Sequence, residues 1–348
     1  MEALVRILHV MSGRAFGEVE RAFEYTVSAL NDFNVTQKLI IKSNPDRAKR
    51  LSSLGMPPLE LPIKPRFDFS SKKKLYLAIE TFDPDIIVSW TSDVSFFLCE
   101  IKRNHIAYVN KDFALYKYES CAHLFSLNSQ RTEPAVQAGW PRSRISVMPP
   151  IILPSKQEPV NRQRFFTPNT SIVAILIGPL PSDEGIENLM RAIARLSGVY
   201  FWILGDGNHM KNLEVMAREE GIKPRTRFIT WSKDAASVVS ASDIVVCPSK
   251  KDYVGVQVLE GWAQRKPVIA CDSVGPGLLI THNENGLLVP IDDITRFSQA
   301  IKQVKEDKVF AKKIGEEGYN NFSQTYSPNI TVPQYLNLFS KVISYTKS

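Results

Sequence analysis

The chain has 348 residues, of which 44% are hydrophobic and 23% are charged, proportions typical of a globular protein with about two domains. It contains no apolar run of the roughly 18 to 20 residues needed for a membrane-spanning helix, and it begins without a secretory cleavage pattern, so we expect a cytoplasmic protein. The net charge of +7 favours an acidic partner, such as an anionic membrane surface, nucleic acid or a phosphorylated glycan.

Short apolar segments alternate with helical patterns along the chain. In the first half they lie at residues 5–10, 37–42, 85–90, 106–110 and 123–128, and in the second half at 171–178, 199–205, 227–231, 243–249 and 267–271. Strands that are continuously apolar and separated by helices are typical of parallel sheets covered on both faces. The sequence therefore predicts an α/β protein with two doubly wound, Rossmann-like domains.

A proline-rich stretch between the two series of strands marks the expected domain boundary. We predict a first domain over residues 1–152, a linker over 153–168 and a second domain over 169–327. The last segment, 328–348, has helical apolar spacing and is predicted to cross back to the first domain. The ligand is expected in the cleft between the domains, at the carboxyl ends of their strands.

Cysteine and histidine spacing gives no indication of a metal site. Cys99, Cys121, Cys247 and Cys271 form no CxxC pair, which suits reduced, buried thiols. The five histidines, His9, His105, His123, His209 and His282, lack ligand spacing and are expected in the core or on the surface. We predict no bound metal.

The loop "GPLPSDEG" (178–185) lies between a predicted strand and the predicted helix 186–196. A strand, a glycine-bounded loop and a helix in this order are typical of a phosphate cradle, because the first N–H groups of the helix face the loop. This loop, however, contains Asp183 and Glu184 and no basic residue.

A second strand, loop and helix occurs at "CPSKKDYVGVQVLEGW" (247–262). Gly255 and Val256 are expected to open a helix whose N–H groups could hold a diphosphate. Asp252 and Glu260 lie on either side of this opening, where they could contact a ligand. Alternatively, Asp252 is a solvated acid in the loop, and Glu260 is an acid that the helix dipole favours near the start of the helix. The glycines of "LGDGN" (204–208), Gly205 and Gly207, fit either a ligand loop or a simple turn.

These segments, together with "RFITWSKD" (227–234) and "SVGPGLLITHNENGLLVPIDD" (273–293), occur in an order that resembles the nucleotide-sugar-binding half of family-4 glycosyltransferases. The first half resembles the family more loosely, in "HVMSGRAFGEVERAF" (9–23) and in "CAHLFSLNSQRTEPAVQAGWPRSRISVMPP" (121–150). Within the family, "PDIIVSW" and "QAGWPRSRISVMPP" are most similar to bacterial enzymes that build the lipopolysaccharide core.

The resemblance implies a GT-B fold and a retaining, metal-independent glycosyltransferase. It further implies a nucleotide-sugar as co-substrate with no other cofactor, and a glycan or lipid-linked acceptor. Asp252 and Glu260 match the family's catalytic acids, with Glu260 expected at the ribose hydroxyls and Asp252 at the transferred sugar. The donor-binding residues implied in the same way are Gly17, Glu18, Gly178, Gly205, Gly207, Ser249, Lys251, Gly255, Val256 and Glu260.

The sequence departs from the family pattern where the donor is expected. Pro179 and Glu184 stand where the family has an Arg and a Lys that hold the diphosphate, and Glu184 is expected to add repulsion. Glu18 replaces the second glycine of the first loop, so that it either narrows the donor pocket or meets a cation. Asp252 is shorter than the family's Glu, and Leu278 replaces a frequent acid. The basic residues Lys250, Lys251 and Arg14 are candidates to substitute for the missing cations.

Two readings of function remain open at this point. The first is a glycosyltransferase of lipopolysaccharide-core or surface-polysaccharide assembly. The alternative is a catalytically impaired GT-B scaffold that binds a glycan, a lipid or a protein. A sugar-nucleotide epimerase would need acids and histidines in the cleft that the sequence does not place.

The segment 62–80 adds an expectation about the acceptor side. It interleaves basic residues with aromatic ones, namely Lys64, Arg66, Lys72, Lys73 and Lys74 with Phe67, Phe69 and Tyr76. This composition suits peripheral contact with an anionic membrane at its inner face, and the alternative is a basic helix start with its aromatic residues in the core. No nucleic-acid-binding module is recognisable, so no nucleic-acid partner is predicted.

Overall fold

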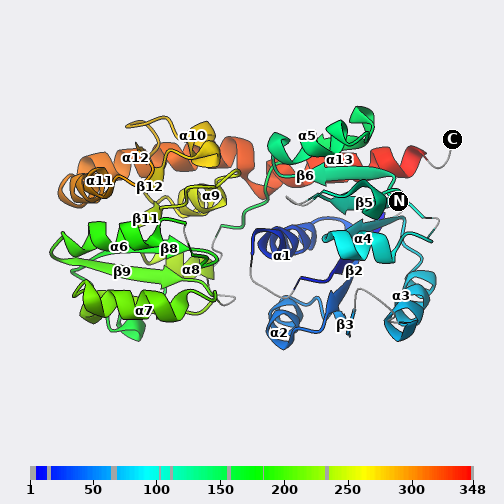
Figure 1. Cartoon of the computed structure of the whole chain (residues 1–348), viewed down its shortest axis with the longest axis horizontal. Helices are drawn as coiled ribbons and strands as arrows, with labels where there is room; N and C mark the ends of the chain where they lie inside the picture. Colours follow the sequence, from blue (N-terminus) through cyan, green and yellow to red (C-terminus); the bar gives the residue numbers. More distant parts are fainter. Residues whose placement is uncertain are drawn as a thin grey trace. The chain divides into compact units, whose positions relative to one another are not determined.

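The computed structural model describes residues 5–13, 17–63, 69–101, 103–109, 113–154, 158–182, 184–231 and 235–345. The chain forms two compact units, one of Met1–Ile151 with Pro328–Ser348 and one of Ile152–Ser327. Each unit has its own parallel sheet with helices packed around it (Figure 1). The prediction of two α/β domains with doubly wound parallel sheets is confirmed.

The first unit is built on a seven-stranded sheet of order β3-β2-β1-β4-β5-β6-β7. Its strands are β1 (Val5–Met11), β2 (Val35–Lys42), β3 (Leu59–Leu61), β4 (Ile86–Ser89), β5 (His105–Tyr108), β6 (His123–Ser126) and β7 (Ile145–Val147). Its α-helices are α1 (Glu18–Leu30), α2 (Pro45–Ser53), α3 (Phe69–Phe82), α4 (Ser92–Phe97), α5 (Ser129–Gln137) and α13 (Pro328–Tyr345).

Strand β1 shows why this sheet is covered on both faces. Successive side chains of a strand point to opposite faces, and every residue from Ile7 to Met11 is buried. Leu8 and Val10 pack in a cluster that includes residues of α3 and α4. His9 lies on the other face, where its ring stacks on Trp90 and meets the edge of Phe23 from α1. A strand with two buried faces has no polar alternation, as its sequence indicates.

Helix α13 packs within the first unit. It contacts α1, and Tyr335 meets Phe125 of β6 edge to face. The Tyr335 hydroxyl donates a hydrogen bond to the carbonyl oxygen of Pro149 at 2.9 Å. The helical spacing at the end of the sequence is thus explained by a buried stripe on α13.

The second unit is built on a six-stranded sheet of order β10-β9-β8-β11-β12-β13. Its strands are β8 (Ile172–Ile177), β9 (Val199–Leu204), β10 (Thr226–Ile229), β11 (Ile244–Cys247), β12 (Val268–Cys271) and β13 (Leu287–Val289). Its α-helices are α6 (Ile186–Ala194), α7 (Met210–Glu219), α8 (Ala235–Ser240), α9 (Val256–Ala263), α10 (Val274–Leu279), α11 (Ile294–Glu306) and α12 (Lys308–Asn321).

Helices of the second unit pack in two sets. Helix α6 contacts α7 and α11, whereas α9 contacts α8 and α12. An apolar cluster joins α6, α7 and α11 to inward residues of the strands, including Phe201, Ile203 and Ile301. This packing fixes the strand ends from which the loops of the candidate site emerge.

All three histidines described in the first unit are buried. Burial lowers the pKa of His9 to about 3 and lowers the pKa of His105 and of His123 to about 4. The Nε2 atom of His105 lies 2.7 Å from the Ser89 hydroxyl, and Nε2 of His123 lies 2.9 Å from the Ser146 hydroxyl. Of the two places expected for the histidines, the core or the surface, these three lie in the core.

We expect the first unit to lose stability in acid because of these imidazoles. In the unfolded chain each imidazole binds a proton near pH 6.5, whereas in the folded chain it does so only at about pH 4 or below. The contribution of each neutral imidazole to the free energy of unfolding is therefore complete above pH 6.5 and declines as the pH falls. The expected slope is about 1.4 kcal/mol per pH unit for each imidazole. Urea unfolding from pH 7 to pH 5 measures it, and His105→Asn should remove one imidazole's share; an unchanged slope would contradict the assignment.

The cysteines follow the prediction with one exception. Cys121, Cys247 and Cys271 are buried free thiols, whereas Cys99 is exposed, so the expectation of burial is wrong for Cys99. Cys99 directly follows α4 and Leu98, whose side chain fills the core position of that turn instead. Among the described residues, no helix is both long and apolar enough to cross a membrane.

Candidate functional site

The second sheet reverses its strand order between β8 and β11, which are neighbours although far apart in sequence. In an open parallel sheet, ligands bind outside the carboxyl ends of the strands at such a switch point. The two loops that begin there are 178–185 after β8 and 248–255 after β11. The topology therefore brings together the two loops that the sequence singled out.

The loop after β8 is closely packed against the loop after β9. The Gly178 N–H donates to the Leu204 carbonyl at 2.9 Å, and Leu180 N–H donates to the Asp206 carbonyl at 3.1 Å. A Cβ atom on Gly205 would collide with the Gly178 carbonyl oxygen, and one on Gly207 would lie 2.6 Å from the Leu180 carbonyl oxygen. Packing between loops is thus a sufficient reason for both glycines, and their contact with a donor stays a prediction.

Glu184 has a hydrogen-bond partner in the other loop at the switch point. Its Oε2 atom accepts a short hydrogen bond from the hydroxyl of Ser249, in the loop after β11. Next to it, Gly185 has φ +84 and lies so close to Pro248 that a Cβ would collide with the Pro248 carbonyl oxygen. This acid therefore joins the two loops at the switch point, and its expected repulsion of a diphosphate stays a prediction. Asp183 lies outside the described residues.

The two lysines before Asp252 differ in their surroundings. The Lys250 ammonium lies 2.6 Å from Asp292 Oδ1, which also accepts from Asn188 Nδ2 of α6 at 2.7 Å. The hydrogen bond from Lys250 lowers the pKa of the Asp292 carboxyl. Lys251 is exposed. Lys250 is committed to an ion pair, which leaves Lys251 as the more available cation; Arg14 lies outside the described residues.

Asp252 shapes the entrance to α9. Its Oδ1 atom accepts hydrogen bonds from Val254 N–H at 2.9 Å and from Gly255 N–H at 2.7 Å. Its backbone carbonyl accepts from Gly275 N–H at 2.8 Å. A Cβ on Gly275 would lie 2.5 Å from the nitrogens of both Val254 and Gly255. The loop before α9 is therefore held by Asp252 on one side and by Gly275, which the sequence analysis did not single out, on the other.

Helix α9 begins at Val256 after Gly255, as the sequence predicts. Gly255 has φ +74, a conformation that glycine adopts without strain. The N–H groups of the first turn have no partner inside the helix and point away from its N-terminus, where an anion is stabilised. Glu260, the fifth residue of α9, is 5% exposed. Leu278, where relatives often have an acid, is 81% exposed.

The predicted glycine loop of the first unit follows β1, which neighbours β4 at the switch point of that sheet. Glu18, the first residue of α1, accepts a hydrogen bond from Arg131 Nη2 at 2.9 Å and another from the Tyr108 hydroxyl at 3.2 Å. Glu18 was expected either to narrow the donor pocket or to meet a cation, and in the structure it meets the cation of Arg131. Its source, α5, is more than a hundred residues away in sequence, so local spacing could not reveal it.

The two histidines of the second unit, His209 and His282, each have a polar partner. His209 Nε2 lies 2.6 Å from Glu187 Oε1 on α6, and His282 Nδ1 accepts from Leu288 N–H at 3.0 Å. Among the residues that the structure describes, no three His, Cys, Asp or Glu side chains are grouped to hold a metal ion.

The comparison with protein families identifies the kind of domain that carries these two loops. The model described as "Glycosyl transferases group 1" matches residues 157–321, which include β8 to α12 and both loops at the switch point. Residues 157–321 form a glycosyl transferases group 1 domain. The prediction that the chain is a glycosyltransferase enzyme is confirmed, and the alternative of an impaired scaffold is not favoured.

Relatives of this glycosyltransferase match along nearly its whole length. It is 26% identical to the lipopolysaccharide core biosynthesis glycosyltransferase LpsE of Rhizobium meliloti (strain 1021), over 97% of this chain and 99% of LpsE. It is also 26% identical to LpsD of the same organism, over 98% of this chain and 99% of LpsD. A crystal structure of Anabaena Alr3699/HepE with UDP and glucose matches with a TM-score of 0.81 at 16% identity, over 97% of this chain and 100% of HepE. The last likeness confirms the GT-B fold.

Proposed function

We propose that this glycosyltransferase moves a sugar from a nucleotide-sugar donor to a glycan or lipid-linked acceptor in the assembly of lipopolysaccharide core or a related surface polysaccharide. The observation that carries the proposal is the segment 252–260, where Asp252, Gly255 and the buried Glu260 lie around the N-terminal turn of α9, beyond the carboxyl end of β11. The similarity to LpsE and LpsD, which are lipopolysaccharide core biosynthesis glycosyltransferases, supports the choice of pathway class.

In this proposal the donor's diphosphate lies at the N-terminus of α9. The free N–H groups of the first turn and the helix dipole stabilise its negative charge. Glu260 accepts hydrogen bonds from two ribose hydroxyls. Because Oδ1 of Asp252 is used by two backbone N–H groups, the sugar hydroxyls are expected to reach its Oδ2. Lys251 provides a side-chain cation in place of the Arg and the Lys that the family has at positions 179 and 184.

The chemistry proposed is retaining transfer without a metal. The bond between the sugar's anomeric carbon and the diphosphate breaks, and the electron pair leaves with the diphosphate. The acceptor oxygen attacks the oxocarbenium-like sugar from the same face, and its proton passes to the leaving diphosphate oxygen. Charge that grows on the leaving diphosphate is stabilised by N–H groups of α9 and by Lys251. No cofactor other than the nucleotide-sugar is required.

Calorimetric titration with UDP-, GDP- and ADP-linked sugars tests the proposed donor site. We expect one base to bind in the micromolar range, and Glu260→Ala to abolish that binding. Binding by none of the donors would contradict the proposed function. Binding that survives Glu260→Ala would place the donor elsewhere.

We further propose that α3 contacts an anionic membrane that carries the acceptor. Lys73 and Lys74 are exposed on α3, and Leu77 on the same helix is 66% exposed, whereas Lys72 pairs with Glu100 at 2.5 Å. Tyr76 lies under the Lys72 ammonium rather than free for lipid. Lys64, Arg66 and Phe67 lie outside the described residues, as does the side chain of Phe69.

Vesicle binding tests this contact. Each exposed lysine contributes about 1 kcal/mol at an anionic surface, so replacing both Lys73 and Lys74 with alanine should weaken binding to vesicles with anionic lipid roughly 30-fold. The matched control replaces Lys312 and Lys313, an exposed lysine pair on α12. Equal losses from the two pairs, or no loss from the first, would contradict a docking role for α3.

A further inference from the structure

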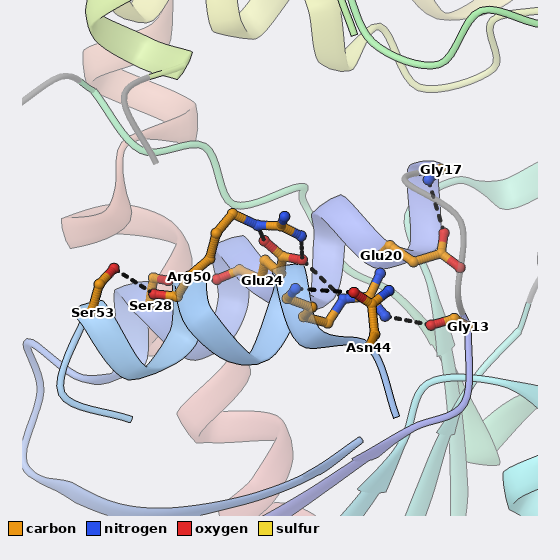
Figure 2. A network of polar contacts seen from close by, with 9 residues as sticks. Gly13, Gly17, Glu20, Glu24, Ser28, Asn44, Arg50 and Ser53 are labelled. Atoms are coloured by element: carbon orange, nitrogen blue, oxygen red, sulfur yellow. Dashed lines mark hydrogen bonds and ion pairs between the residues drawn. The ribbon is translucent and has the colours of Figure 1, made fainter. Parts of the chain in front are cut away.

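Four charged side chains from α1 and α2 gather near Gly13 and Gly17 (Figure 2). Glu20 and Glu24 come from α1, and Arg47 and Arg50 come from α2. We call these four residues the Glu24 cluster. They reach the backbone at Gly13, where β1 has just ended, and at Gly17, the residue before α1.

Arg47 holds the Gly13 side of this connection. Its side chain is 1% exposed, its Nε donates to Glu24 Oε1 at 2.9 Å, and its Nη1 donates to the Gly13 carbonyl oxygen. The Arg47 N–H in turn donates to the Asn44 side chain at 3.0 Å, which caps α2. A buried guanidinium needs several acceptors at fixed positions, so α2 and the Gly13 backbone are tied to each other.

Glu20 holds the Gly17 side. Its Oε2 accepts the Gly17 N–H at 3.0 Å, as Figure 2 shows. A Cβ on Gly17 would lie 2.8 Å from Oε2, and one on Gly13 would lie 2.9 Å from the Glu20 carboxyl carbon. A side chain at either position would therefore force this carboxylate to shift. Burial raises the pKa of Glu20, and the neighbouring charge of Arg47 opposes this rise.

Glu24 joins the two arginines. Its Oε1 lies 2.9 Å from Arg47 Nε and 2.7 Å from Arg50 Nη2, and its Oε2 accepts from Arg50 Nε at 3.0 Å. The two arginines thus share one carboxylate, and Arg47 adds the hydrogen bond to the Gly13 carbonyl oxygen. This difference provides a matched pair of substitutions, because either one leaves Glu24 with one arginine.

We propose that Arg47 and Glu20 are positioning residues, which fix the backbone at Gly13 and Gly17 so that Gly17 and Glu18 meet the donor in one geometry. The inference rests on the proposed function for its effect on catalysis, because Gly17 and Glu18 are predicted donor-binding residues. Glu18 is held independently by Arg131 and Tyr108. The start of α1 is therefore held from α2 on one side and from α5 and β5 on the other.

Kinetics of Arg47→Lys and Arg50→Lys test the proposal. Lysine keeps the positive charge but cannot bridge Glu24 and the Gly13 carbonyl as the guanidinium fork does. We expect Arg47→Lys to raise the donor KM about tenfold or more and to leave the acceptor KM within about twofold, and Arg50→Lys to leave both within about twofold. A purely structural role would instead lower kcat through loss of folded enzyme, with both KM values unchanged. An unchanged donor KM in Arg47→Lys, or an equal rise in Arg50→Lys, would overturn the proposal.

Glu20 provides a second pair of variants if Arg47→Lys does not fold. Glu20→Gln keeps an oxygen that can accept the Gly17 N–H, whereas Glu20→Ala removes it. Rescue is expected: the donor KM stays within about threefold in Glu20→Gln and rises about tenfold in Glu20→Ala. Equal donor KM values in the two variants would contradict a role for this hydrogen bond.

Amide hydrogen exchange separates this inference from the proposed function. Peptides that contain Gly13 and Gly17 should exchange faster in Arg47→Lys than in Arg50→Lys, whether or not the wild-type chain transfers a sugar. If the wild type transfers none, the proposed function fails and the exchange comparison alone decides whether Arg47 positions this backbone. Equal exchange in the two variants would overturn the positioning role in either case.

Discussion

Replacing Glu260 with glutamine is expected to lower kcat/KM for sugar transfer about a hundredfold or more, because a carboxylate contributes about 1.5 kcal/mol or more to each of the two hydrogen bonds proposed between Glu260 and ribose. Glu260 is 5% exposed and lies on α9 one turn from its start, so a neutral amide of nearly the same shape should leave the packing in place. Steady-state kinetics with saturating acceptor measure the change, and thermal unfolding checks that the fold is kept.

The control for Glu260 is an acid outside the candidate site. Glu219 is exposed on α7, and Glu219→Gln should leave kcat/KM within about twofold. Retention of most activity by Glu260→Gln would remove this residue from the donor site and would favour its other reading, an acid placed near a helix start by the dipole.

Replacing Gly205 with alanine is expected to destabilise the second unit by about 3 kcal/mol or more, at the upper end of overpacking effects. The added Cβ would collide with the Gly178 carbonyl oxygen and lie 3.0 Å from its carbon. Both are backbone atoms held by the Gly178 hydrogen bond to Leu204 and the Gly205 hydrogen bond to Ile229, so neither can move aside. Urea unfolding measures the loss.

Gly221 provides the matched control in the same unit. It has φ +69, and a Cβ there would meet nothing within 4 Å, so alanine should cost only about 1 kcal/mol of backbone strain. A Gly205→Ala variant that loses no more stability than Gly221→Ala would show that the contact between the two loops is dispensable. The glycine would then be explained better by a ligand than by packing.

The longer strands could be predicted from the sequence, because a strand that is buried on both faces appears there as a continuous apolar run. Strands β3, β7 and β13 escaped prediction, since each has three residues and runs that short have no readable period. Cys99 was misplaced because it ends an apolar run in sequence, while the turn after α4 directs Leu98 rather than Cys99 to the core.

Around the candidate site, spacing predicted the elements but not their polar partners. The start of α9 at Gly255 follows from a local pattern, and the structure agrees. The bond from Ser249 to Glu184 joins residues 65 apart, and the ion pair of Glu18 with Arg131 joins residues 113 apart. Only the folded sheet brings such pairs together, so the acids that looked like defects in the sequence acquire partners in the structure.

The most direct test of the central claim is a transfer assay with purified full-length chain, a panel of labelled UDP-, GDP- and ADP-sugars, and lipopolysaccharide core truncated at successive sugars as the acceptor. Detection of the lengthened core by mass spectrometry identifies donor and acceptor together. We predict that one donor extends one truncated core, with the anomeric configuration of the donor retained, and that Glu260→Gln suppresses the product. Donor hydrolysis or binding without any lengthened glycan, across the whole panel, would contradict the assignment.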